Sequence, residues 1–467
     1  MQISFHGAAR NVTGSKHLIS LDNGTKILLD CGMFQGMGEE TDQLNEHFGF
    51  NPANINYLIL SHAHIDHSGL IPRLVAEGFK GDIFCTAATM DLARILLMDS
   101  ARIQQQDSDY SNKHRKRKGL SLLKPLYTEE DAMLALRQFK IIKYNTEHQI
   151  NNEITVLLTD VGHITGSAAV HLSIKEDAKT IRLTFSGDVG RYGDMILKSP
   201  EIFPQSDYIL LESTYGDSLH EDAEPAEDLL KEIIYQTCIL RGGKVIIPAF
   251  SVGRTQELLY SLNHLEERGI LPDVKYYVDS PLSIKATNVV KSHPENFNKH
   301  VQEVMLHDDD PFNFKNLNFI QETKDSIALN TDPEPCVVIS SSGMAEAGRV
   351  KHHIKNSITD EKNTILMVGY CEPNSLGGRL AAGYNVVTIF GQEFPVRAEI
   401  RSVRSMSAHG DYNDLLQFIA CQDPSKVKKV FLVHGEFDVQ QNLRDKVLNK
   451  GFPIVEIPER HQEFLLD

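Results

Sequence analysis

Short apolar runs bounded by Gly, Asn or Asp dominate the first part of the chain. Four of these runs predict strands, at residues 3–5, 16–21, 25–30 and 57–61. Helical periodicity follows at residues 69–78 and 89–111, and Thr128 before three acidic residues is typical of a helix N-terminus. Three more strands are predicted at residues 154–158, 168–174 and 181–186. The sequence therefore predicts that the first part of the chain consists mainly of strands, with few helices.

The pattern changes after residue 206, where near-continuous apolar runs alternate with helical segments. The strand and helix pairs lie at residues 244–248 and 254–263, 274–278 and 283–291, and 336–340 and 347–355. Such alternation predicts an α/β domain with a parallel sheet that helices cover on both faces. From residue 401 the pattern returns to a helix at 411–421 and a strand at 428–433. We therefore expect a domain of residues 206–400, inserted into a first domain made of residues 1–205 and 401–467.

Length and composition agree with a multidomain globular protein. A chain of 467 residues exceeds what one hydrophobic core usually organises, and 41% hydrophobic with 24% charged residues is ordinary for folded domains. No apolar run approaches the roughly 20 residues that span a bilayer, and the N-terminus resembles no secretion signal, so we expect a cytoplasmic protein without membrane contact. Six dispersed cysteines without a Cys-x-x-Cys pair argue against disulfides or a structural zinc knot.

The net charge of −16 argues against binding a polyanion over the whole surface. Any contact with nucleic acid must then be local. One local candidate is the run Lys-His-Arg-Lys-Arg-Lys at residues 113–118. Such a run is either a solvated face or loop, which is the more common case, or a binding patch.

The clearest chemical signal is a cluster of metal-binding side chains at residues 61–67, Ser-His-Ala-His-Ile-Asp-His. Neutral imidazoles with a carboxylate are the ligands of a zinc ion that keeps one position open for water. Spacing by two points His62 and His64 the same way, and Asp66 and His67 elsewhere. A polar surface cluster is the alternative, but four such groups directly after a buried strand are costly without a ligand. The sequence therefore predicts a hydrolytic metal site.

The motif His-x-His-x-Asp-His resembles the signature of the metallo-β-lactamase superfamily. The resemblance implies a four-layer αββα sandwich and a site completed by His163 in Asp-Val-Gly-His, Asp188 in Phe-Ser-Gly-Asp and His434 in Val-His-Gly. It implies two zinc ions per chain, one held by His62, His64 and His163, the other by Asp66, His67 and His434, with Asp188 bridging.

Asp30, at the end of a predicted strand, matches the first motif of the same family. The resemblance implies that Asp30 orients a ligand histidine and does not bind metal itself. An ordinary turn residue at a strand end is the alternative.

The inserted domain and two further motifs are similar to the β-CASP group of RNA-processing nucleases, which includes the cleavage-and-polyadenylation-type endonucleases. These motifs are Glu212 in Leu-Leu-Glu-Ser-Thr-Tyr-Gly and His409 in Met-Ser-Ala-His-Gly-Asp. The resemblance implies a zinc-dependent ribonuclease that hydrolyses phosphodiester bonds of single-stranded RNA by a metal-activated hydroxide. Asp66 would orient the hydroxide, and His409, supported by Glu212, would be the general acid at the leaving 3′-oxygen. We expect endonuclease activity, and the resemblance leaves open whether the protein also has 5′-exonuclease activity.

Two strand-turn-helix segments of the inserted domain are candidate phosphate contacts. Ser251 and Arg254 follow the strand at 244–248, and Ser342 and Gly343 follow the strand at 336–340. Backbone N–H groups at a helix start, with a cation nearby, suit a phosphate. Close packing of small residues at such a turn is the alternative.

Three other functions remain open at this point. Hydrolysis of a small ester, thioester or lactam needs neither an inserted domain nor the Glu212 and His409 pair. An RNA-binding scaffold without catalysis would not need the intact ligand set. Di-iron redox chemistry is conceivable because ligands of this type do not fix the metal. A homodimer is also open, and residues 104–118 would serve either RNA contact or dimerisation.

Overall fold

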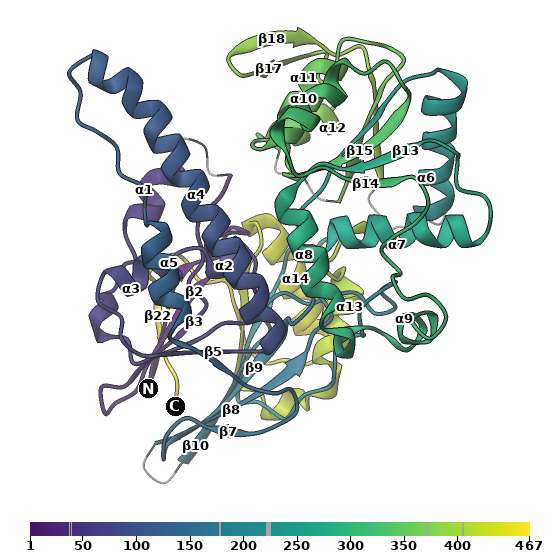
Figure 1. Cartoon of the computed structure of the whole chain (residues 1–467). Coiled ribbons are helices and arrows are strands. Elements are labelled where there is room, and N and C mark those ends of the chain that lie inside the picture. The colour runs from purple at the N-terminus through teal and green to yellow at the C-terminus, as the bar shows by residue number, and fades with distance from the viewer. Residues whose placement is uncertain are drawn as a thin grey trace. The chain divides into compact units, whose positions relative to one another are not determined.

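The structure is a computed structural model, and it describes residues 1–36, 38, 40–176, 179–220, 226–369, 371, 373–403 and 406–467. The chain divides into two compact units. Unit 1 comprises Met1–Leu219 and His409–Asp467, and unit 2 comprises His220–Ala408. Figure 1 shows both units as a cartoon, with many of the helices and strands labelled.

Unit 1 contains two seven-stranded sheets. The first sheet has the order β22-β1-β2-β3-β4-β5-β6, with strands at Glu463–Leu465, Gln2–Gly7, Lys16–Ser20, Lys26–Leu29, Tyr57–Ile59, Asp82–Cys85 and Phe139–Ile141. The second has the order β21-β20-β11-β10-β9-β8-β7, with strands at Val455–Glu456, Lys429–Val433, Tyr208–Glu212, Lys179–Phe185, Ala168–Glu176, Ile154–Asp160 and His148–Gln149. The helices are α1 Glu40–Glu46, α2 Ile65–Ser68, α3 Ile71–Ala76, α4 Ala87–Arg117, α5 Glu129–Leu136, α13 Tyr412–Phe418 and α14 Phe437–Asn449.

The two sheets of unit 1 pack face to face around one apolar core. Ile27, Leu29 and Ile59 from the first sheet share this core with Val170 and Leu183 from the second. Alternate residues of the second sheet point outward, where they form another core with apolar residues of α13 and α14. Helices α3, α4 and α5 pack together beside the first sheet. These layers confirm the predicted four-layer αββα sandwich.

Helix α4 is longer than the periodicity of residues 89–111 predicts. Thr86 begins it by accepting a hydrogen bond from the Thr89 backbone, and the helix continues through Arg117. Lys and Arg have high helix propensity, and cations in the last turn interact favourably with the helix dipole. The basic run therefore lies largely within a helix. Thr128 forms a capping box with Asp131 at the start of α5, as predicted.

Unit 2 contains a six-stranded sheet with the order β14-β13-β15-β12-β16-β19. All its paired strands are parallel, at Leu317–Phe319, Lys275–Val278, Cys336–Ser340, Val245–Pro248, Thr364–Val368 and Glu399–Val403. A two-stranded sheet joins β17 Val386–Ile389 to β18 Gln392–Pro395. The helices are α6 Ala226–Ile234, α7 Arg254–Glu267, α8 Pro281–Lys291, α9 Lys299–Val304, α10 Thr323–Thr331, α11 Arg349–Ser357 and α12 Leu376–Ala381. This is the parallel α/β sheet that the alternating pattern predicts.

The boundaries between the units fall later in the chain than the sequence pattern predicts. Strand β11 was expected in the inserted domain, but it pairs with β10 and β20 of unit 1. Strand β19 spans the expected second boundary and pairs with β16 of unit 2. Apolar composition predicted β11 but not β19, and the sheet that each strand joins depends on pairing with distant segments.

Membrane insertion finds no support in the helices that the structure describes. None of them combines the length with the apolar character needed to cross a bilayer.

Candidate metal centre

The loop after β4 and the short helix α2 carry the first four candidate ligands. His62 and His64 lie in the loop, and Asp66 and His67 lie on α2. Two hydrogen bonds from neighbouring segments hold the backbone of α2. Ser15 N donates to Asp66 O at 2.8 Å, and Cys31 N donates to His67 O at 2.8 Å. Gly32 permits this approach, because a Cβ there would lie 1.6 Å from the Asp66 carbonyl oxygen. Two neighbouring loops therefore fix the ligand-bearing turn.

The first cluster gathers His62, His64, His163 and Asp188. His64 Nδ1 lies 3.1 Å from His62 Nε2 and 3.2 Å from His163 Nε2. Asp188 Oδ2 lies 3.5 Å from Nε2 of both His62 and His163. Donors about 2.0–2.1 Å from one zinc at tetrahedral angles lie about 3.3 Å from one another. The spacing of these four atoms therefore fits one zinc ion.

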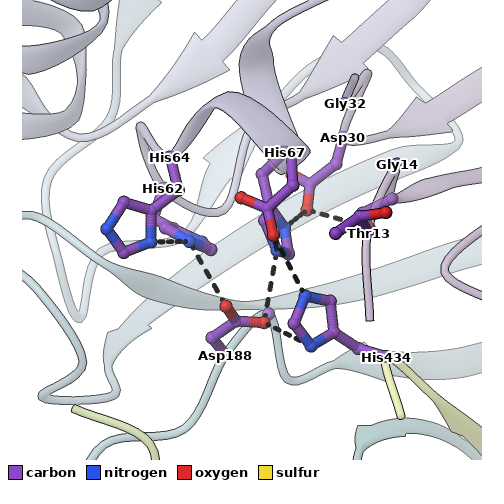
Figure 2. Close-up of polar contacts among 12 residues, drawn as sticks. Thr13, Gly14, Asp30, Gly32, His62, His64, His67, Asp188 and His434 are labelled. Atoms are coloured by element: carbon purple, nitrogen blue, oxygen red, sulfur yellow. Dashed lines mark hydrogen bonds and ion pairs between the residues drawn. The ribbon is translucent and has the colours of Figure 1, made fainter. Parts of the chain in front are cut away.

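The second cluster gathers Asp66, His67 and His434 beside the other oxygen of Asp188. Asp188 Oδ1 lies 3.3 Å from His67 Nε2 and 3.6 Å from His434 Nδ1, while His434 Nε2 lies 3.4 Å from Asp66 Oδ2. Figure 2 shows Asp188 beneath the histidines, with interactions running to both clusters. The two oxygens of one carboxylate thus face two different ligand sets, which is the arrangement that a bridging ligand needs.

Two buried atoms at this centre lack a proper hydrogen bond among the described residues. They are His67 Nε2 and Asp188 Oδ1, whose side chains are 1% and 2% exposed. An unsatisfied buried acceptor and imidazole nitrogen cost free energy unless something else binds them. A metal ion would satisfy both, so the donor set fits the group that the sequence predicts.

The ionisation states of His62 and His64 suit metal binding, and the carboxylates around His67 favour a cation. Burial holds the pKa of His62 well below its usual range and lowers the pKa of His64 to about 4, so both rings are neutral near pH 7. Burial also opposes protonation of His67, but Asp188, Asp66 and Asp30 together raise the pKa of His67 well above normal. Three converging carboxylates therefore favour positive charge at this position, which a bound divalent cation would supply.

Asp30 lies behind His67 as the family resemblance implies. Its Oδ2 is 2.6 Å from His67 Nδ1, and Ser61 donates to Asp30 through its backbone N at 2.8 Å and its hydroxyl at 2.9 Å. A carboxylate bonded to Nδ1 directs Nε2 of the same ring at the second cluster. Asp30 also has a left-handed backbone, with φ of 58°. This conformation is uncommon outside glycine and is held here by the hydrogen bonds of the turn.

His434 is positioned by a residue that the sequence motifs do not single out. Its backbone is also left-handed, with φ of 53°, and its N donates to Ala8 O at 2.8 Å. The hydroxyl of Thr214 lies 3.0 Å from His434 Nδ1 and donates to the His434 carbonyl at 3.2 Å. Thr214 stands two residues after Glu212, so its place in the same motif was the only sequence signal.

Glu212 and His409 form a pair at the edge of the first cluster. Glu212 is fully buried at the end of β11, and its Oε1 is 3.1 Å from His409 Nδ1. Val189 N donates to Glu212 Oε1 at 2.8 Å, and Thr214 N donates to Oε2 at 3.0 Å. The His409 ring centre lies 4.5 Å from that of His163, and ligand atoms of Asp188, Glu212 and His409 fall within 4.8 Å of one another. The pair is therefore part of the same centre.

The charge of Glu212 keeps His409 protonated. Burial favours the neutral ring, but the carboxylate of Glu212, with smaller effects of Asp188 and Asp66, raises the pKa of His409 to about 9. A histidine held through Nδ1 and protonated near pH 7 carries its second proton on Nε2. This is the chemistry of a general acid.

Lys16 is a second residue that sequence reasoning missed. It is fully buried, its Nζ donates to Gly14 O at 2.8 Å and Gly32 O at 2.7 Å, and it lies 4.3 Å from the centre of the Phe34 ring. Lys16 thereby ties together the two loops that hold α2. A lysine at the start of a predicted apolar strand was the signal that could have identified it.

The buried state of Lys16 predicts a pH-dependent stability. Burial lowers the pKa of Lys16 from 10.5 to about 7. Between these values the unfolded chain binds more protons than the folded one, so the free energy of unfolding should rise with pH, by up to about 1.4 kcal/mol per unit. Urea unfolding at pH 7, 8 and 9 should show this rise in the wild type relative to Lys16→Met. The same comparison with the half-buried Lys26→Met should show no difference in slope, and equal slopes for all three proteins would contradict the assignment.

The four candidate phosphate contacts lie in unit 2, whereas the candidate metal ligands belong to unit 1. Arg254 is 6% exposed at the start of α7, and its guanidinium is ion-paired with Glu257. A Cβ on Gly343 would lie 2.6 Å from the Phe250 ring, so close packing alone explains this glycine. Ser251 is also buried, and the Ser342 hydroxyl bonds to the Ala347 carbonyl at 3.4 Å. A role of these residues in phosphate binding stays a prediction.

Comparison with known proteins agrees with this architecture. Family models match residues 17–235 as the metallo-beta-lactamase superfamily, 255–380 as the Beta-Casp domain and 393–456 as the Zn-dependent metallo-hydrolase RNA specificity domain. The chain is 34% identical to "Ribonuclease TTHA0252" of Thermus thermophilus, over 93% of each chain. It is 32% identical to an "RNase J-like protein" of Methanocaldococcus jannaschii, over 93% of this chain and 92% of the relative.

Two further matches extend the comparison. "Transcription termination factor FttA" of Methanocaldococcus jannaschii is 30% identical over 93% of this chain and 67% of its own length. The crystal structure of a protein of unknown function from Enterococcus faecalis V583 superposes with a TM-score of 0.52 at 12% identity, over 100% of this chain and 99% of that chain. This last likeness concerns the fold alone. The family models, the full-length relatives and the gathered motif residues together show that the chain belongs to the β-CASP group of the metallo-β-lactamase superfamily.

Proposed function

We propose that this chain is a two-zinc ribonuclease that cleaves single-stranded RNA internally. The proposal leaves open whether the same site also has 5′-exonuclease activity. Its relatives are named ribonucleases, and one matching family model describes an RNA specificity domain. The observation that carries the proposal is the Glu212 and His409 pair within the metal centre. Hydrolysis of an activated ester or lactam does not need a dedicated, protonated acid of this kind.

The proposed roles follow from what each group can do at a phosphodiester. Two zinc ions, held by the two clusters, would neutralise phosphoryl oxygens and lower the pKa of an attacking water. Asp66 is the most exposed ligand carboxylate, at 20% against 2% for Asp188, so it can orient that water by accepting a hydrogen bond. Asp188 stays buried between the two ligand clusters and sets the distance between them.

His409 acts on the leaving group. As the bond from phosphorus to the 3′-oxygen breaks, the proton on His409 Nε2 passes to that oxygen, and the neutral ring keeps its Nδ1 contact with Glu212. Glu212 cannot turn away, because the Val189 and Thr214 backbone N–H groups hold both of its oxygens. The products carry a 5′-phosphate and a 3′-hydroxyl. Glu212 is therefore a positioning residue, and His409 is the catalytic acid.

Metal removal and return tests this proposal. Chelator-treated protein should lose cleavage of an end-labelled single-stranded RNA by at least about 10³-fold, and two equivalents of zinc should restore it. Thermal unfolding should shift upward over the same titration, since zinc binds only the folded site. Undiminished cleavage after chelation, or full activity at one equivalent, would contradict the two-zinc assignment. Opening of a thioester without cleavage of any RNA would favour the small-substrate alternative.

Two other expectations stay predictions. Light scattering of the purified protein measures whether two copies associate, and fractionation of cells measures the expected cytoplasmic location.

A further inference from the structure

The far end of α4 and the chain that follows it concentrate positive charge. Between Tyr110 and Thr128 the sequence has no acidic residue and six Lys or Arg residues, namely Lys113, Arg115, Lys116, Arg117, Lys118 and Lys124. All but Arg115 are exposed, and none of the six has an ion pair among the residues that the structure describes. The helix dipole accounts for one or two cations in a last turn, not for six. In a chain of net charge −16 this is a strong local reversal.

The cations lie on a structured projection. The chain that follows α4 turns back along the helix and forms hydrogen bonds with it. The Asn112 side chain donates to Leu123 O at 2.9 Å and accepts from Leu123 N at 2.8 Å. Arg115 Nε donates to Ser121 O at 2.6 Å, and the buried Tyr127 donates its hydroxyl proton to Ser100 at 2.8 Å. Figure 1 shows α4 as one long helix with the chain turning back at its far end. We call residues 110–127 the basic arm.

The distribution of charge on the basic arm suits a flexible polyanion. Consecutive helical residues are about 100° apart, so the exposed cations Lys113, Lys116 and Arg117 form one stripe about 100° wide along the helix, opposite the side on which Arg115 bonds to the returning chain. A single strand of RNA can lie along this stripe with its phosphates against the cations. Tyr110 is 80% exposed and offers a ring on which a base can stack.

The opposite end of α4 is anchored at the metal centre. The hydroxyls of Thr86 and Thr89 both donate to Gly166 O, at 2.7 and 2.8 Å, and Gly166 lies three residues after His163. A helix of 31 residues is about 46 Å long at about 1.5 Å per residue. A stacked strand rises about 3.4 Å per nucleotide, so a strand needs on the order of 13 nucleotides to reach from one end to the other.

We propose that the basic arm is an RNA-docking site that binds the substrate at a distance from the bond that is cut. The inference rests on the proposed ribonuclease function and adds a substrate property to it, a dependence on RNA length. Long RNAs engage both the metal centre and the basic arm. RNAs of a few nucleotides engage the metal centre alone.

The test replaces five cations of the arm and compares two RNA lengths. The variant carries Gln at the five exposed positions and keeps Arg115, which bonds to the returning chain; Gln has good helix propensity, so α4 should persist. These positions are Lys113, Lys116, Arg117, Lys118 and Lys124. A matched control variant replaces five exposed cations elsewhere in unit 1, at Lys80, Lys143, Lys179, Arg182 and Lys450.

For a 30-nucleotide RNA the arm variant should raise KM about tenfold or more at unchanged kcat, and for a 6-nucleotide RNA it should change neither. The slope of log affinity against log salt should fall in magnitude by up to about 3.5, at about 0.7 per lost phosphate contact. The control variant should match the wild type on both RNAs. Equal kinetics of arm and control variants would overturn the proposal, as would an equal loss on both RNA lengths.

Binding of the uncleaved 30-nucleotide RNA to chelator-treated protein, followed by fluorescence anisotropy, separates the two proposals. If the wild type cuts no RNA, the proposed function fails, and the anisotropy comparison still decides the inference. An arm variant that retains RNA affinity but loses self-association, or loses binding to vesicles of anionic lipid, would overturn it in favour of another occupant.

Discussion

Asp188→Asn will abolish RNA cleavage, with a fall in kcat on the order of 10⁴-fold, and will lower the zinc content of the purified protein. The reason is geometric, because the two oxygens of Asp188 face the two ligand clusters at 3.3–3.6 Å. An amide keeps one oxygen but loses the charge, and its NH₂ group cannot bind a metal. Single-turnover cleavage and elemental analysis of the same sample measure both effects.

Asp160→Asn is the matched control for this prediction. Asp160 is a buried aspartate at the end of β8, close in sequence to His163, and it accepts a hydrogen bond from Gly162 N at 2.9 Å. Burial raises the pKa of Asp160 to about 7, so a neutral side chain is tolerated there, and activity should change less than tenfold. If Asp188→Asn retains two zinc ions and near-normal kcat, the bridging role is wrong.

His409→Ala will lower kcat on RNA by about 10²–10⁴-fold while leaving the zinc content unchanged. The natural leaving 3′-oxygen needs a proton, whereas the leaving group of bis(p-nitrophenyl) phosphate does not. On that substrate the variant should therefore lose less than tenfold. This contrast separates a general acid from a residue that only supports the metal site, since damage to the metals would slow both substrates equally.

Glu212, which is bonded to His409, provides a second test of the general-acid role. Glu212→Gln removes the charge that raises the pKa of His409, so it should lower kcat on RNA in the same direction. The double variant should be little worse than His409→Ala, because both changes remove one function. Additive losses would show that Glu212 and His409 act separately.

The pH dependence of kcat on RNA provides a further test of the general-acid role of His409. In the proposed role His409 donates a proton, so its contribution would be present below its pKa and lost as pH rises through that value, which is about 9 without bound metal. Bound zinc adds positive charge nearby and lowers the value. The wild type should therefore show a decline of kcat on the alkaline side, and His409→Ala should not. A decline of equal size in both proteins would assign it to another group.

The local sequence was sufficient for the first four candidate ligands, whereas His163, Asp188 and His434 were predicted from the family resemblance. His62 and His64 alternate in a loop, and Asp66 and His67 follow on a short helix, so spacing alone separated the two pairs that the structure assigns to different clusters. The capping box at Thr128 and the apolar strands of unit 2 were also local properties. Helix caps, turns and alternation depend on neighbours within a few residues, which is why sequence patterns predict them.

Tertiary structure alone decided which sheet each strand joins and which side chains support the ligands. Strand β11 belongs to unit 1 because it pairs with β20, more than two hundred residues later in the chain. Lys16 and Thr214 support the centre through contacts with Gly32 and His434 that no spacing rule encodes. Pairing and burial bring together segments far apart in sequence, so their partners become visible only when the chain is folded.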